Sequence, residues 1–103
     1  MTLPVGYADG VPRRLSGKLR IAVQGQSFPV VGRICMDMMM VDIGERAMSL
    51  DAEVTLLGQG AQSIHDWAEL SGTIPYELLT QLGRRWSRVY MQDGQISTIA
   101  RPV

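Results

Sequence analysis

Two short segments near the start of the chain combine residue types that can hold a small charged molecule. Residues 6–10 (Gly-Tyr-Ala-Asp-Gly) place a phenol and a carboxylate between two glycines, so we expect the backbone to turn there and project both side chains. Residues 12–14 (Pro-Arg-Arg) present two guanidinium groups, whose planar donors suit a carboxylate or a phosphate. The spacing alone favours a simpler interpretation of each: an Asp-Gly turn beside a packed tyrosine, and a solvated basic turn.

A third segment, residues 32–37 (Gly-Arg-Ile-Cys-Met-Asp), predicts one side of a polar pocket. In an extended strand Arg33, Cys35 and Asp37 share one face, so the arginine and the aspartate could line one pocket together. We interpret Cys35 as a small buried hydrophobe between them. The methionines in and after this segment are interpreted as core residues: Met36, Met38, Met39 and Met40.

Residues that commonly carry catalysis are scarce. Lys18 is the only lysine and lies in a polar turn, which predicts a solvated surface amine rather than a Schiff-base lysine. His65, the only histidine, falls in the first turn of a predicted helix and is expected at the surface. Because Cys35 is the only cysteine, the sequence predicts no internal disulfide and no multi-cysteine metal site. No metal site and no Ser-His-Asp triad is predicted.

The composition is that of one globular domain. A length of 103 residues suffices for one domain, and 46% hydrophobic residues suffice for a core. Ten basic and ten acidic residues cancel, so no basic excess favours nucleic acid or an anionic membrane. No apolar run is long enough for a membrane span, and the start lacks the pattern of a signal peptide. With a single cysteine, we expect a reducing cytoplasm.

Short strands dominate the predicted elements. Alternating or continuous apolar runs predict strands over residues 19–23, 28–40, 41–43 and 53–57, and the pair Asp93-Gly94 predicts a hairpin between residues 89–92 and 95–100. Two helices interrupt them. One runs from the N-cap Ser63 to Leu70, and another from Pro75 to Leu82 with Gly83 after its end. The predicted class is mainly β: a small β-barrel-like domain with two short helices before the C-terminal hairpin.

Three segments in this order, residues 6–10, 32–37 and 72–77 (Gly-Thr-Ile-Pro-Tyr-Glu), resemble the C-terminal domain of alanine racemases. The similarity continues through residues 84–90 almost to the end of the chain. It implies that residues 1–103 are this domain, without the N-terminal (β/α)8 barrel that carries pyridoxal 5′-phosphate on a lysine. Alanine racemases are homodimers that interconvert L- and D-alanine for peptidoglycan precursors, and each C-terminal domain packs over the mouth of the partner's barrel.

The resemblance assigns residues of this chain to a substrate channel rather than to catalysis. It implies that the main-chain N–H of Met36 meets the substrate carboxylate and that Tyr76 hydrogen-bonds the cofactor phosphate. Both catalytic bases, the cofactor lysine and a tyrosine from the other subunit, are expected outside this chain. Further channel residues implied by the resemblance are Tyr7, Arg13, Arg33, Asp37 and Ile74.

The resemblance also predicts how the isolated chain behaves. It should neither racemise nor bind the cofactor tightly, and surface meant for the barrel and the second subunit should make it self-associate. Two alternatives stay open. The chain could be a free-standing anion-binding or dimerisation module built on Tyr7, Arg13 and Arg33. It could also come from a serine or broad-specificity amino-acid racemase, since specificity depends on the barrel as well.

Overall fold

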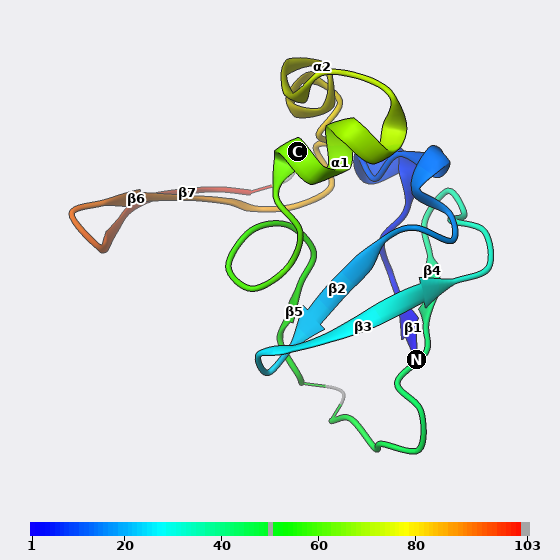
Figure 1. Cartoon of the computed structure of the whole chain (residues 1–103). Coiled ribbons are helices and arrows are strands. Elements are labelled where there is room, and N and C mark those ends of the chain that lie inside the picture. Colours follow the sequence, from blue (N-terminus) through cyan, green and yellow to red (C-terminus); the bar gives the residue numbers. More distant parts are fainter. Residues whose placement is uncertain (50, 102–103) are drawn as a thin grey trace.

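One curled antiparallel sheet forms the body of the chain, as described for residues 1–49 and 51–101 by a computed structural model (Figure 1). Its strand order is β1-β4-β3-β2-β5, and every neighbouring pair is antiparallel. This confirms the predicted mainly β, barrel-like class with two short helices before a C-terminal hairpin. The five strands are β1 (Thr2–Leu3), β2 (Arg20–Val23), β3 (Gln26–Val31), β4 (Met39–Val41) and β5 (Val54–Thr55).

The core lies on one side of this sheet. β3 buries Phe28 and Val30, and β4 buries Met39 and Val41, so alternate side chains along these parts of the two strands enter the core. Burying an aliphatic or aromatic side chain of this size stabilises a fold by about 1.5–3 kcal/mol. Each of the two helices adds one large buried side chain to the same cluster: Trp67 and Leu78.

The prediction that the methionines are core residues was mostly wrong. Met39 is fully buried, but Met36, Met38 and Met40 are 55%, 45% and 47% exposed. Met40 lies on the outer face of β4, where its neighbour in β3 is the exposed Val31. A sheet with one covered face turns every second side chain outward whatever its hydrophobicity, which the composition of a methionine run cannot reveal.

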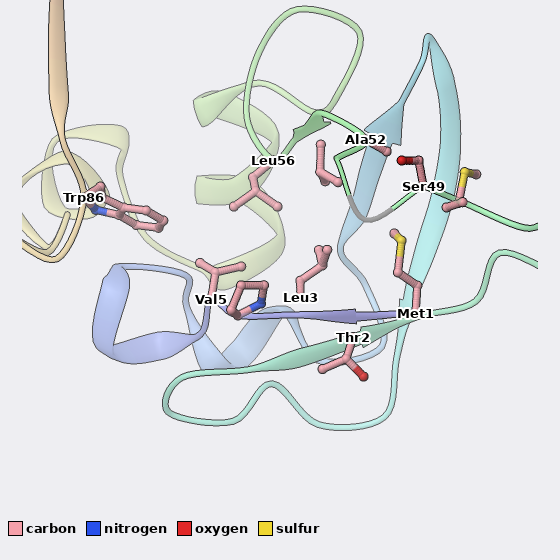
Figure 2. Close-up of a pocket in the computed structure, with 11 residues that line it drawn as sticks. Met1, Thr2, Leu3, Val5, Ser49, Ala52, Leu56 and Trp86 are labelled. Atoms are coloured by element: carbon pink, nitrogen blue, oxygen red, sulfur yellow. The ribbon is translucent and has the colours of Figure 1, made fainter.

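The barrel does not close, because β1 and β5 are the two edges of the sheet. An apolar groove of about 400 Å³ lies beside both edge strands, and Figure 2 shows Leu3, Leu56 and Trp86 among the side chains that line it. None of the site residues predicted from the sequence lines this groove in the described chain. It is therefore a gap in the barrel, separate from the segments singled out for their chemistry.

The first helix agrees with its prediction. α1 (Ile64–Ser71) begins at Ser63, whose hydroxyl accepts a hydrogen bond from the N–H of Asp66, while the Asp66 carboxylate accepts one from the N–H of Ser63. Gly72 ends the helix in the left-handed conformation, at φ +73°. His65 is exposed in the first turn, as predicted.

The second helix is shorter than predicted. α2 (Pro75–Thr80) starts at the expected proline but ends at Thr80, two residues before the predicted Leu82, and Gly83 does not adopt the left-handed conformation of a helix cap. Gly83 is instead pressed against the N-terminal turn, where an added Cβ would lie 2.9 Å from the carbonyl oxygen of Ala8. None of the described helices has the length and apolar character needed to cross a bilayer.

The C-terminal hairpin is confirmed, and it extends away from the sheet and helices (Figure 1). β6 (Arg88–Gln92) and β7 (Gln95–Ala100) are joined by Asp93 and Gly94, whose φ values of +53° and +78° fit a type I′ turn. Within the described residues, neither strand of this hairpin pairs with a strand of the five-stranded sheet. A two-stranded hairpin by itself is at best marginally stable in water.

One face of this hairpin is apolar. Val89 pairs with Ile99 and Met91 pairs with Ile96, across a register shift that lies between Tyr90 and Met91. Directly paired residues place their side chains on the same face of a sheet, so these four side chains form one surface, which we name the hairpin face. Their exposed fractions are 44–60%, so the described chain leaves this surface largely uncovered.

Candidate functional site

The largest departure from the sequence prediction lies between β3 and β4. Residues 32–38 form a loop instead of a strand, beginning at Gly32, whose φ of +69° is left-handed. Arg33 and Asp37 therefore do not share a strand face, and Cys35 is exposed rather than buried. Ile34 is only 1% exposed, so it anchors the loop in the core while its neighbours face outward.

Main-chain hydrogen bonds join this loop to the glycine-bracketed turn. The turn contains a short 3-10 helix, η1 (Tyr7–Asp9). The N–H groups of Tyr7 and Ala8 donate to the carbonyl oxygens of Cys35 and Met36, each at 2.9 Å. Two segments that the sequence singled out separately thus form one hydrogen-bonded junction.

Gly6 makes this junction possible because it has no side chain. A Cβ at Gly6 would lie 2.1 Å from the carbonyl oxygen of Cys35 and 2.6 Å from that of Met36. Its φ and ψ, −158° and −157°, lie in the extended region. The close approach of two backbones, rather than an unusual backbone conformation, is therefore what requires glycine here.

A serine hydroxyl ties the arginine turn to the same loop. The turn is a second 3-10 helix, η2 (Arg13–Leu15). The Ser16 hydroxyl donates to the carbonyl oxygen of Arg13 at 2.7 Å and accepts a hydrogen bond from the N–H of Ile34 at 2.9 Å. Arg13 and Arg33, both exposed, are consequently carried by backbone segments that meet at one hydroxyl.

Met36 presents an available main-chain donor at the junction. Its carbonyl accepts from Ala8, but among the described residues 1–49 and 51–101 no group accepts a hydrogen bond from its N–H. Its side chain is 55% exposed and Tyr7 is 46% exposed, so this region is open to solvent. An N–H group held by its neighbours and left without a partner can bind a carboxylate oxygen.

Two predicted site residues lie on a neighbouring element. Ile74 and Tyr76, at the start of α2, are 60% and 76% exposed, and within the described chain the Tyr76 hydroxyl makes no hydrogen bond to the junction. The segment after this helix is fixed to the junction, because the N–H of Gly83 donates to the carbonyl oxygen of Asp9 at 3.1 Å. The structure thus brings together the backbones that carry Tyr7, Arg13, Arg33, Met36 and Asp37, and leaves Ile74 and Tyr76 on the adjoining helix.

The turn at residues 6–10 is also held by an ion pair between Asp9 and Arg85, which the sequence did not predict. Asp9, expected to project outward, is 1% exposed and receives hydrogen bonds from Arg85, Nε to Oδ1 at 2.7 Å and Nη2 to Oδ2 at 2.5 Å. The same carboxylate accepts the N–H of Gly6 at 3.0 Å. Asp9 and Arg85 are 76 positions apart, so no local spacing could have indicated their contact.

Acidification is expected to remove the stabilisation that Asp9 provides. The pKa of its carboxyl lies below the ordinary value, chiefly because the Arg85 side chain donates hydrogen bonds to the carboxylate; burial opposes this, and the N–H of Gly6 and the charge of Arg85 reinforce it. A carboxyl whose pKa is lower in the folded state stabilises the fold fully above its unfolded pKa, about 3.9, and loses that effect as the pH falls through the folded pKa.

The measurement is a set of urea titrations of the chain and its Asp9→Asn variant. Their difference in the free energy of unfolding should stay constant between about pH 7 and pH 5 and shrink below about pH 4. The other carboxyl groups are the same in both proteins, so their titration cancels in the difference. A difference that persists unchanged well below pH 3 would show that the charge of Asp9 has no such effect.

The protein-family model described as "Alanine racemase, C-terminal domain" matches residues 1–90 of the sequence. The chain belongs to this family. Curated alanine racemases resemble it in sequence: alanine racemase 1 of Clostridium acetobutylicum is 42% identical over 102 residues, covering 95% of this chain, and alanine racemase of Clostridium novyi is 46% identical over 100 residues, covering 92%.

Solved structures agree with this alanine racemase assignment. An alanine racemase from Bacillus anthracis with bound L-Ala-P superposes with a TM-score of 0.86 at 36% identity, covering 97% of this chain and 26% of that one. An alanine racemase from Bartonella henselae with covalently bound pyridoxal phosphate gives 0.76 at 39% identity, covering 87% of this chain and 26% of that one. The chain likewise spans only 26% of each of the two curated relatives, so it corresponds to about a quarter of those proteins.

Proposed function

We propose that this chain supplies the C-terminal domain of a pyridoxal-phosphate-dependent alanine racemase, an isomerase that interconverts L- and D-alanine for peptidoglycan precursors in the cytoplasm. The observation that carries the proposal is the junction between the turn at residues 6–10 and the loop at residues 32–38. It combines an unpartnered Met36 N–H with two exposed arginines carried nearby. An amino-acid substrate has a carboxylate, for which this is a suitable set of donors.

Each of these predicted site residues has a role in binding rather than in bond making. The Met36 N–H binds the substrate carboxylate, and the guanidinium groups of Arg13 and Arg33 attract the anion into the channel. Tyr7 and Ile74 restrict the width of the channel, and Asp37 lies among these polar groups. No residue of this chain is assigned a catalytic role.

The chain's residues also suit a cofactor that is attached elsewhere. Its only lysine, Lys18, is exposed and donates to the carbonyl oxygen of Leu70 at 3.5 Å, so this surface amine is not assigned as a Schiff-base lysine. Tyr76 has an exposed side chain whose phenol can donate to a phosphate oxygen. When bound, pyridoxal phosphate supplies the electron sink for the carbanion formed at the substrate α-carbon.

The partners of this domain are the upstream barrel and a second subunit. In their absence the hairpin face stays exposed, and exposed apolar surface of this kind favours association. We therefore expect the isolated chain to form dimers or larger species at high concentration, measured by multi-angle light scattering. The variant Val89→Thr/Ile99→Thr should shift the population toward monomer, whereas the exposed polar control Gln92→Ser should not. A monodisperse monomer at high concentration would contradict this expectation.

A mixing experiment tests the proposed function. The purified chain is combined with pyridoxal phosphate, L-alanine and the separately expressed upstream part of alanine racemase 1 from Clostridium acetobutylicum, and D-alanine is measured. We expect no racemisation from either part alone and D-alanine formation from the mixture. Racemisation by the chain alone would contradict the proposal. If the mixture racemises serine faster than alanine, the substrate assignment fails while the racemase assignment stands.

A free-standing anion-binding module is the alternative that one feature favours. A cavity of about 290 Å³ is lined by Arg13, Arg14 and Glu77 together with polar groups at the end of α1. Arg14 is already engaged there, since its Nη1 donates to the carbonyl oxygen of Ser71 at 3.3 Å. The alternative predicts that the isolated chain binds alanine or inorganic phosphate by calorimetry, and the racemase proposal predicts that it does not.

A further inference from the structure

We infer that Arg85 is a positioning residue for the substrate-channel site: through Asp9 it fixes the turn that carries Tyr7 and holds the Met36 loop. Arg85 lies outside the three segments that identify the site, and it comes from the stretch between α2 and the C-terminal hairpin. Its kinetic consequence rests on the proposed function. Its structural consequence can be measured without any racemase activity.

One guanidinium group spans the base of the turn. Arg85 donates from Nε to Asp9 Oδ1 at 2.7 Å and from Nη2 to Asp9 Oδ2 at 2.5 Å. The same Nη2 donates to the carbonyl oxygen of Pro4 at 2.9 Å. Arg85 therefore connects the chain just before the turn with the residue that ends η1. Only a planar group with several donors can make these contacts together.

The contacts continue from Asp9 to the loop. The Asp9 carboxylate also accepts the N–H of Gly6 at 3.0 Å, and the next two N–H groups, of Tyr7 and Ala8, bind the carbonyl oxygens of Cys35 and Met36. Every step in this series is a hydrogen bond of 3.0 Å or less. A change at Arg85 is thereby transmitted to the backbone of Met36, although no hydrogen bond joins these two residues in the described chain.

Because Asp9 is buried, this series of hydrogen bonds depends on Arg85. Asp9 is 1% exposed, whereas the Arg85 side chain is 55% exposed, so the arginine supplies most of the hydrogen bonds of a carboxylate that water cannot reach. Removing the arginine leaves a buried charge with the Gly6 N–H as its remaining donor, and such a group moves to reach water or becomes protonated. Either response changes the turn that carries Tyr7.

The first test measures hydrogen exchange in the isolated chain by NMR. In Arg85→Ala and in Arg85→Lys, which keeps the charge but not the planar fork, the amides of Tyr7 and Ala8 should exchange at least tenfold faster than in the wild type. Amides of the β2–β3 pair should be unchanged. The matched control is Arg84→Ala, which removes the same charge from the adjacent exposed position. Unchanged Tyr7 and Ala8 exchange, or an equal increase throughout the sheet, would overturn the inference.

The second test uses a full-length fusion in which this chain replaces the matching 26% of the Clostridium acetobutylicum relative. If Arg85 positions the Met36 N–H, Arg85→Lys should raise KM for L-alanine roughly tenfold while kcat stays within about threefold, because a binding contact is lost. A merely structural role would lower kcat through loss of folded enzyme and leave KM unchanged, which would overturn the inference. An inactive wild-type fusion would count against the proposed function alone, and the exchange measurement would still decide the role of Arg85.

Discussion

Gly6→Ala is expected to lower the free energy of unfolding by about 3 kcal/mol, at the upper end of the effects of overpacking. The reason is steric: the new Cβ would lie 2.1 Å from the carbonyl oxygen of Cys35 and 2.6 Å from that of Met36. Both neighbours are backbone atoms, so no side chain can rotate away. The loop at residues 32–38 would have to leave the turn, and the hydrogen bonds from Tyr7 and Ala8 would be lost. Urea denaturation of the chain measures the effect.

Gly17→Ala is the matched control for this change. Gly17 has a left-handed φ of +77°, but an added Cβ there would meet no atom within 4 Å. Gly17→Ala should therefore lower the free energy of unfolding only by the conformational cost of an L-residue in the left-handed region, about 1–2 kcal/mol. If Gly6→Ala destabilises the chain no more than Gly17→Ala does, the tight backbone junction is not as we describe it.

Met36→Pro is expected to raise KM for L-alanine about tenfold to hundredfold in the full-length fusion, with little change in kcat. Proline has no N–H, so the substrate carboxylate would lose the main-chain donor that the proposed site provides. A hydrogen bond to a charged group contributes about 1.5–3 kcal/mol, and each 1.4 kcal/mol is a factor of ten in binding. Steady-state kinetics in the L-to-D direction measure the effect.

Met36→Ala is the control, because it removes the side chain and keeps the N–H. Its KM should remain close to that of the wild type, since the Met36 side chain is exposed and does not hold the junction together. A melting temperature close to wild type for both variants would show that the loop still folds. If alanine raises KM as much as proline does, the side chain rather than the main chain binds the substrate.

The fold was largely predictable because its elements are specified locally. The helix at residues 64–71 has a capping box and a C-terminal glycine, and Asp93-Gly94 specifies the hairpin, so each depends on a few neighbouring residues. The limits of α2 were less predictable. Gly83 has the position expected of a helix cap, but packing against Ala8, 75 positions away, determines its conformation instead.

Two of the segments that the sequence singled out do meet in the structure, but in a geometry that the sequence did not predict. The family resemblance pointed to the segments at residues 6–10 and 32–37, and the structure joins them, yet as a turn and a loop rather than as a turn and a strand. Apolar character suggested a strand, whereas the left-handed Gly32 and the backbone contacts with Tyr7 and Ala8 determine the loop. The ion pair of Asp9 with Arg85 depends entirely on tertiary structure, so no window of sequence contained it.

The most direct test of the central claim is the rate of D-alanine formation by the full-length fusion. Its control is the Clostridium acetobutylicum relative truncated before the region that this chain replaces. We expect the truncated protein to be inactive and the fusion to racemise L-alanine with pyridoxal phosphate bound. A fusion that folds and binds pyridoxal phosphate but forms no D-alanine would contradict the claim that this chain supplies the channel side of an alanine racemase site.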